Sequence, residues 1–130
     1  MTNNPQSVEA STPVLEAAKL LKQLDVGSLP TLDDGRLVGM VTDRDIVLRV
    51  VAEGKDVGST TVGEIASTDL ITVDPQQNLD EALRLMAQHQ VRRLPVVEED
   101  GRLVGILAQA DVAHEGEDLK TGQLVERISN

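Results

Sequence analysis

A threonine and an aspartate three positions apart, Thr42 and Asp45, are the residues best placed to do chemistry. They follow an apolar segment, and a strand that runs into a helix here would present free backbone amides and the positive end of the helix dipole, which attract a phosphate. The Asp45 carboxylate could accept hydrogen bonds from hydroxyl groups. The same spacing is also that of a capping box, which satisfies two backbone amides without a ligand. Both interpretations stay open on these residues alone.

Catalytic and metal-binding chemistry has little support in the sequence. The chain has no cysteine and only two histidines, His89 and His114, so disulfides and thiolate chemistry are excluded. The charged run Asp43-Arg44-Asp45 has no histidine nearby and is explained by a helix start. No serine, histidine and acid occur together in a way that predicts a nucleophilic triad. We therefore predict that the chain is not an enzyme and holds no metal and no catalytic cofactor.

Charge and composition narrow the classes of partner. The net charge is -10, which opposes binding to the phosphate backbone of nucleic acids or to anionic membranes. The aromatic content of 0% removes stacking platforms for exposed bases. No apolar run approaches the roughly 18 residues that cross a bilayer, and the first residues lack the features of a secretory signal. We expect a cytoplasmic protein that binds neither nucleic acid nor membrane.

An internal repeat organises the chain. A shift of 65 positions aligns Ser11–Leu32 with Gln76–Val97, and a shift of 66 aligns Asp33–Ile46 with Glu99–Val112. The identical residues in the first alignment are Glu16, Ala17, Leu20, Gln23, Val26, Leu29 and Pro30; in the second they are Asp34, Gly35, Arg36, Leu37, Val38, Gly39 and Asp45. Two copies of one structural unit are therefore predicted.

The first repeat begins with a helix of about twelve residues that starts after Thr12 as N-cap and ends before Gly27. Two strands joined by a turn at residues 33–35 follow, and a second helix runs from Thr42 to a glycine C-cap at Gly54. Another capping-box pattern, Thr61-Val62-Gly63-Glu64, predicts a short linking helix between the repeats.

The second repeat shows the same order of elements. We predict a strand at Ile71–Val73, a helix from Leu79 with a capping box between Asn78 and Glu81, a hairpin at residues 99–101, and a helix after Ala108. Leu124, Val125 and Ile128 suggest a final amphipathic helix. The predicted division is 1–56 for the first repeat, 57–67 for the linker helix, 68–115 for the second repeat and 116–130 for the C-terminal helix.

Several of these segments resemble the paired CBS domain, or Bateman module. The resemblance is carried by Val26–Pro30 and Val91–Pro95, by the hairpins Asp34–Gly39 and Asp100–Gly105, and by the run Gly39–Asp45. It implies an α/β (α+β) fold of two β-α-β-β-α CBS repeats packed about a pseudo-two-fold axis. It also implies a regulatory module that binds an adenine nucleotide (AMP, ADP, ATP or a related adenosyl compound) between the repeats and forms a homodimer.

The resemblance also suggests which residues bind the nucleotide. In such modules the aspartate receives the ribose hydroxyls and the threonine contacts phosphate, which points to Asp45 and Thr42, with Arg44 between them. In the γ subunit of AMP-activated protein kinase, basic residues at the positions of Arg92 and Arg93 reach across the axis towards phosphate. A solvated charged edge strand is the alternative explanation of this arginine pair.

The second repeat departs from the family pattern. It keeps Asp111 but has Ala108 where the first repeat has Thr42, so it lacks the hydroxyl. Leu70 and Ile71 form a more apolar wall for a base than the corresponding N-terminal segment, so each half-site has a different defect. Which half-site is occupied stays open, as does the regulated protein partner. A module that only dimerises and binds no small molecule is the alternative function.

Overall fold

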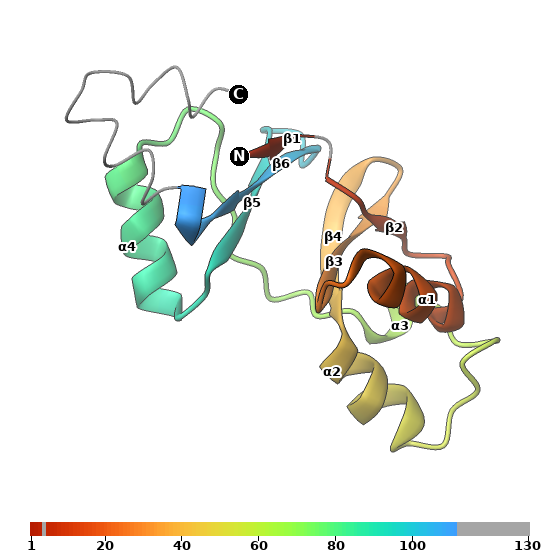
Figure 1. The fold of residues 1–130 in the computed structure, drawn as a ribbon. Coiled ribbons are helices and arrows are strands. Elements are labelled where there is room, and N and C mark those ends of the chain that lie inside the picture. Colours follow the sequence, from red (N-terminus) through yellow and green to blue (C-terminus); the bar gives the residue numbers. More distant parts are fainter. Residues whose placement is uncertain (4, 112–130) are drawn as a thin grey trace. The chain divides into compact units, whose positions relative to one another are not determined.

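The computed structural model describes residues 1–3 and 5–111, and the chain divides into two compact units. The first unit comprises Gln6–Leu70, and the second comprises Met1–Pro5 together with the chain from Ile71 onward. Each unit holds a three-stranded sheet and its own apolar core. Figure 1 labels α1, α2 and α3 in the first unit and α4 in the second. The predicted α/β class and the two structural copies are confirmed.

In the first unit the sheet order is β2-β3-β4. Strand β2 pairs in parallel with β3, and β3 pairs with β4 in an antiparallel hairpin, as predicted. The elements in chain order are β2 (Val8–Glu9), α1 (Val14–Leu24), β3 (Ser28–Asp33), β4 (Arg36–Thr42), α2 (Asp43–Ile46), the π-helical turn η1 (Val47–Val51) and α3 (Val62–Ile65).

Helix α1 buries one face in the core of the first unit and ends in a left-handed turn. Val14, Ala17 and Leu21 recur at helical spacing and are buried. The predicted N-cap at Thr12 is wrong by one position: Pro13 is the N-cap and makes no side-chain cap bond. At the C-terminal end Asp25 has φ 55°, and the Val26 amide donates to the Leu21 carbonyl at 3.1 Å.

Helix α2 continues directly into η1, so the predicted second helix exists but changes its hydrogen-bonding period after Ile46. It ends as predicted at Gly54, which has φ 69°. The Gly54 amide donates to the Val51 carbonyl at 3.1 Å and the Lys55 amide to the Val50 carbonyl at 2.9 Å, a Schellman motif.

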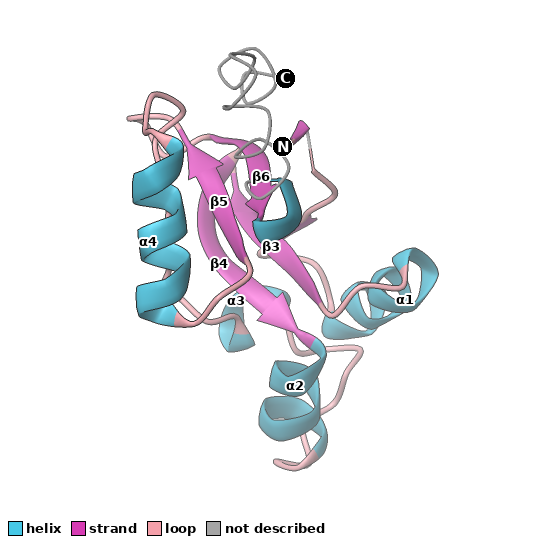
Figure 2. Cartoon of the chain, turned by 60° about the vertical axis from the view of Figure 1, so that its left-hand side comes forward, coloured by secondary structure: helices cyan, strands magenta, loops and turns pink. Residues whose placement is uncertain are grey.

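The second unit has the sheet order β1-β6-β5. Its elements are β1 (Thr2–Asn3), α4 (Leu79–His89), β5 (Arg93–Val97) and β6 (Leu103–Ala108), and α4 packs against β5 (Figure 2). Residues 109–111 are helical where the described part ends. The remainder of the helix predicted after Ala108, the predicted C-terminal helix and His114 lie outside the described residues.

Two details of the second repeat correct the sequence-based expectations. The strand predicted at Ile71–Val73 is reduced to one parallel bridge between Val73 and Val96. Asn78 does cap α4 by accepting the Glu81 amide at 2.9 Å, but the Glu81 carboxylate pairs with Arg84 at 3.0 Å instead of returning to the cap. The predicted capping box is therefore half formed.

Strand β1 was not predicted. It explains the glycine of the second hairpin, Gly105, as the Ser67 backbone explains Gly39 in the first. Thr2 pairs with Ile106 in the second unit, just as Ser67 pairs with Met40 in the first. A Cβ atom added at Gly39 would lie 2.9 Å from the Ser67 carbonyl oxygen, and one at Gly105 would lie 2.9 Å from that of Thr2. In both units a neighbouring backbone passes too close for a side chain.

Candidate functional site

The Thr42 and Asp45 pair lies at the junction of β4 and α2 and forms a complete capping box. The Asp45 amide donates to the Thr42 hydroxyl oxygen at 2.9 Å, and the Thr42 amide donates to Asp45 Oδ2 at 3.0 Å. The apolar strand β4 and the buried Ile46 fix the junction from both sides. The capping interpretation is thus confirmed, and it does not exclude a ligand because Asp45 Oδ1 is not used by the box.

The other oxygen of Asp45 faces an arginine that sequence analysis did not single out. Arg49 Nε lies 3.8 Å from Asp45 Oδ1, while Arg49 Nη1 donates to the Ile65 carbonyl at 3.0 Å. The Asp45 side chain is only 14% exposed, so this carboxylate is largely shielded with a cation beside it. The i,i+4 spacing of Asp45 and Arg49 was the signal that could have identified this contact.

The other first-unit candidates are less constrained. Arg44 is exposed at the start of α2, and its amide donates to Asp43 Oδ1 at 2.7 Å. Leu70 is half-buried at the end of the first unit. Thr42, Arg44 and Asp45 are therefore brought together by one turn of helix, whereas Leu70 comes from a separate segment of the same unit.

In the second unit the equivalent junction keeps one of the two box bonds. The Ala108 amide donates to Asp111 Oδ2 at 3.1 Å, but Ala108 has no hydroxyl to accept the Asp111 amide. The N-terminal ammonium of Met1 lies 3.6 Å from the same carboxylate oxygen. Asp111 Oδ2 thus accepts the one backbone bond of this junction, whereas the Thr42 and Asp45 junction has two.

Arg92 and Arg93 lie at the start of β5, and both are exposed. Arg93 stands directly opposite Ala108 in the β5–β6 ladder, at the register position that Ser28 and Thr42 share in the first unit. Arg93 is thus the ladder partner of the residue whose amide makes the remaining box bond. Ile71 packs against the core of this unit.

Two further observations on the described part of the chain concern metal ligands and membrane spans. No group of three or more histidine, cysteine, aspartate or glutamate side chains is placed to hold a metal ion among these residues. Within the same residues, no helix is long and apolar enough to cross a membrane.

A comparison of the sequence with models of protein families finds a match in each half of the chain, over the repeated hairpin and strand-to-helix junction. The CBS domain model matches residues 1–52 and again residues 62–118. The chain belongs to the CBS-domain family. The two matches correspond to the two sequence repeats, so the resemblance inferred from the repeated motifs is confirmed.

Similar CBS proteins cover most of the chain. It is 48% identical over 113 residues to the CBS domain-containing protein YhcV of Bacillus subtilis, which covers 87% of this chain and 79% of YhcV. Hypoxic response protein 1 of Mycobacterium tuberculosis is 47% identical over 98 residues, covering 75% of this chain and 68% of that protein.

Solved structures of CBS-pair proteins have the same fold. Hypoxic Response Protein I with two coordinated zinc ions aligns with a TM-score of 0.78 at 42% identity, covering 88% of this chain and 93% of that one. CBSX2 in complex with AMP aligns with a TM-score of 0.76 at 33% identity, covering 92% and 94%. CBS-pair proteins are in general regulatory modules without catalytic activity.

Proposed function

We propose that this protein is a non-enzymatic regulatory module that binds an adenine nucleotide through the Thr42 and Asp45 junction. The observation that carries the proposal is the state of the Asp45 carboxylate. One oxygen is held by the Thr42 amide, and the other lies in a largely shielded position beside Arg49 with capacity to accept hydroxyl groups. The AMP complex of the similar protein CBSX2 makes an adenine nucleotide the first ligand to test.

In this proposal Asp45 accepts the ribose hydroxyls and Thr42 contacts phosphate. Arg44, Arg92 and Arg93 are exposed cations available to the phosphate groups, and their exposure leaves them free to rearrange around a ligand. Leu70 and Ile71 supply an aliphatic wall for the base, and Asp111 would serve the second half-site. We expect the first half-site to bind more tightly because only Thr42 offers a hydroxyl.

Calorimetry with AMP, ADP, ATP and adenosine tests the proposal. Asp45→Asn keeps an acceptor for the Thr42 amide but removes the charge, so nucleotide affinity should fall at least about tenfold. The matched variant Asp111→Asn should leave that affinity within about twofold. Equal affinity of wild type and Asp45→Asn for every nucleotide would refute the first half-site.

The phosphate contacts can be tested separately. Replacing both Arg92 and Arg93 by alanine should weaken ATP and AMP binding and spare adenosine, because adenosine has no phosphate to pair with a guanidinium. An equal loss for adenosine would mean that the arginines support the fold or the base and do not bind phosphate.

A specific observation favours the alternative function, a module that dimerises without a ligand. In η1 the side chains of Val47, Leu48 and Val51 are 54%, 46% and 62% exposed. Three neighbouring apolar side chains on one turn form a surface suited to a partner. We propose that this surface joins two copies of the chain, whether or not nucleotide binds.

Light scattering at micromolar concentration tests this interface. Wild type should have twice the 14.0 kDa chain mass. Val51→Glu should produce monomers, whereas Val38→Glu, which alters an exposed valine on β4, should not. A monomeric wild type would refute the homodimer. If wild type is dimeric and binds none of the nucleotides, the dimerisation module is the function that remains.

A further inference from the structure

Helix α3 is too short to be stable on its own and depends on contacts with the rest of the first unit. It has four residues, and a helix of that length forms in water only when tertiary contacts support it. At its N-terminal end the Thr61 amide donates to the Glu64 carboxylate at 2.6 Å. Val62 and Ile65 are 0% and 1% exposed and fix one face in the core. The carbonyl groups at its C-terminal end still need partners.

One of these carbonyl groups is bound by Arg49, which lies in η1. Arg49 Nη1 donates to the Ile65 carbonyl at 3.0 Å, and a cation at this end of a helix is favoured by the helix dipole. The same guanidinium places Nε 3.8 Å from Asp45 Oδ1. One planar group with donors in fixed directions therefore contacts both the carboxylate of the candidate site and the end of α3.

The helix changes its period between the two residues of this ion pair. Asp45 belongs to α2, and Arg49 belongs to the π-helical turn η1, in which the Ala52 amide donates to the Val47 carbonyl at 2.8 Å. A π-helical turn is rare and occurs frequently at functional sites, because it changes the directions of the side chains that follow it. The unusual turn thus carries the side chain that links Asp45 to α3.

The segment after α3 leads to the end of the first unit. Ser67 pairs with Met40 on β4 through two backbone hydrogen bonds: the Met40 amide donates at 2.9 Å and the Ser67 amide at 2.8 Å. The first unit ends at Leu70, and the chain enters the second unit at Ile71. A change in how firmly α3 is docked would therefore affect the segment by which the chain leaves the first unit.

We propose that Arg49 is a positioning residue that couples the Asp45 carboxylate to the docking of α3. The ligand part of this inference rests on the function proposed above. A hydroxyl group that donates to Asp45 Oδ1 can also accept the Arg49 Nε hydrogen, so it would contact both sides of the 3.8 Å separation. It would hold the guanidinium in place and strengthen its bond to the Ile65 carbonyl. Because coupling is reciprocal, a docked α3 also favours ligand binding.

Amide hydrogen exchange tests the coupling without a ligand. The Ala66 amide is the reporter, since it donates to the Val62 carbonyl at 2.9 Å and closes the last turn of α3. Arg49→Gln removes the charge and the planar set of donors, so Ala66 exchange should become about fivefold faster or more. Asp45→Asn should accelerate it about twofold in wild type and not at all in the Arg49→Gln background, because Asp45 acts on α3 only through Arg49.

Arg36→Gln is the matched control, because it removes an exposed arginine from β4 in the same unit. It should change Ala66 exchange less than about twofold. Additive effects of Arg49→Gln and Asp45→Asn would overturn the coupling. An effect of Arg36→Gln as large as that of Arg49→Gln would do the same, because the response would then be one of general stability.

AMP binding provides the second test. Saturating AMP should slow Ala66 exchange about threefold or more in wild type and leave it unchanged in Arg49→Gln, whose AMP affinity should fall about fivefold. Arg49→Lys keeps a cation on this side chain but not the planar set of donors, so it should restore the affinity more than the exchange protection.

The outcomes separate this inference from the proposed function. AMP binding that depends on Asp45 but leaves Ala66 exchange unchanged would refute the coupling and leave the nucleotide site intact. If wild type binds no nucleotide while Arg49→Gln and Asp45→Asn show the non-additive exchange effects, the proposed function is refuted and the coupling of Asp45 to α3 is retained.

Discussion

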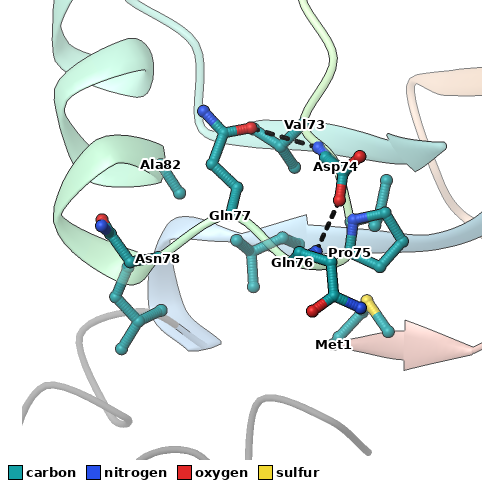
Figure 3. A pocket seen from close by; sticks show the side chains of 11 residues that line it. Met1, Val73, Asp74, Pro75, Gln76, Gln77, Asn78 and Ala82 are labelled. Atoms are coloured by element: carbon teal, nitrogen blue, oxygen red, sulfur yellow. Dashed lines mark hydrogen bonds between the residues drawn. The ribbon is translucent and has the colours of Figure 1, made fainter. Parts of the chain in front are cut away.

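The two units are built from one repeated sequence but complete their junctions and cores differently. In the first unit Thr42 and Asp45 exchange two hydrogen bonds, and α3 inserts Val62 and Ile65 into the core. In the second unit Ala108 leaves one bond, and a cavity of about 230 Å³ is lined by core residues such as Val73, Leu79 and Leu107 (Figure 3). Both units therefore contain the hairpin and the helix before it, but they differ in the hydrogen bonds of the strand-to-helix junction and in the segments that complete each core. The functional site proposed above lies in the more complete unit.

The largest expected effect concerns the repeated glycines. Gly39→Ala should destabilise the protein by about 2 to 3 kcal/mol, because its Cβ would press on the Ser67 backbone and on Ala66 Cβ. Gly105→Ala should cost only about 1 kcal/mol, since the Met1 side chain is flexible and β1 has two residues that can shift. Urea denaturation measures both.

Gly58→Ala is the control for this comparison, because its Cβ would meet only the Asp56 carboxylate at 3.5 Å. It should leave stability nearly unchanged. If Gly39→Ala were as stable as Gly58→Ala, the close approach of the Ser67 backbone would not be what requires glycine.

A second comparison uses a buried polar atom that occurs in one unit only. Thr31 is completely buried on β3, and its hydroxyl has no hydrogen-bond partner among the described residues. Val96 occupies the equivalent position in the second unit. Thr31→Val should stabilise the protein by about 1 to 2 kcal/mol because an unsatisfied hydroxyl leaves the core.

The reverse exchange, Val96→Thr, should destabilise by a similar amount, about 1 to 2 kcal/mol. Thermal unfolding of both variants would show shifts of opposite sign. A loss of stability in Thr31→Val would mean that the hydroxyl has a partner in solution, such as a buried water.

The hydroxyl that caps the Thr42 and Asp45 junction, and that the Ala108 and Asp111 junction lacks, should contribute about 1 kcal/mol to the free energy of unfolding. Thr42→Ala removes the hydroxyl that accepts the Asp45 amide, and such a cap contributes about that much. Ala108→Thr supplies the missing hydroxyl three positions before Asp111 and should stabilise by up to about 1 kcal/mol. Denaturant midpoints that do not move in either variant would mean that these caps do not contribute to stability.

The smallest expected effect is the pH dependence of the α3 cap. Hydrogen bonds from the Thr61 amide and then the Thr61 hydroxyl lower the pKa of Glu64 below its usual 4.5. A lowered pKa in the folded state stabilises the protein above the unfolded pKa, and this contribution is lost as the pH falls through the folded value. The advantage of wild type over Glu64→Gln should therefore be present at neutral pH and shrink in acid. A difference that is the same at both would rule out the carboxylate charge as its source.

Local sequence patterns predicted most of each repeat. The periodicity of Val14, Ala17 and Leu21 indicated α1, and the threonine and acid spacing placed the start of α2 correctly. A competing local contact explains the half-formed capping box, because the Glu81 carboxylate pairs with Arg84. Such exposed alternatives differ by a few tenths of a kcal/mol. The strand predicted at Ile71–Val73 depends on backbone pairing with a segment far along the chain, and only Val73 reaches β5.

The sequence by itself determined the family, the two copies of the structural unit, and the pairing of Thr42 with Asp45. These features depend on residues close together in the chain, where spacing and propensity decide the geometry. Only the tertiary structure decided that Met1–Pro5 belongs to the second unit, that Arg49 also donates to the Ile65 carbonyl, and that a cavity opens onto the second core. These contacts join segments far apart in sequence or depend on which backbone passes beside Gly39 and Gly105, and no local pattern encodes them.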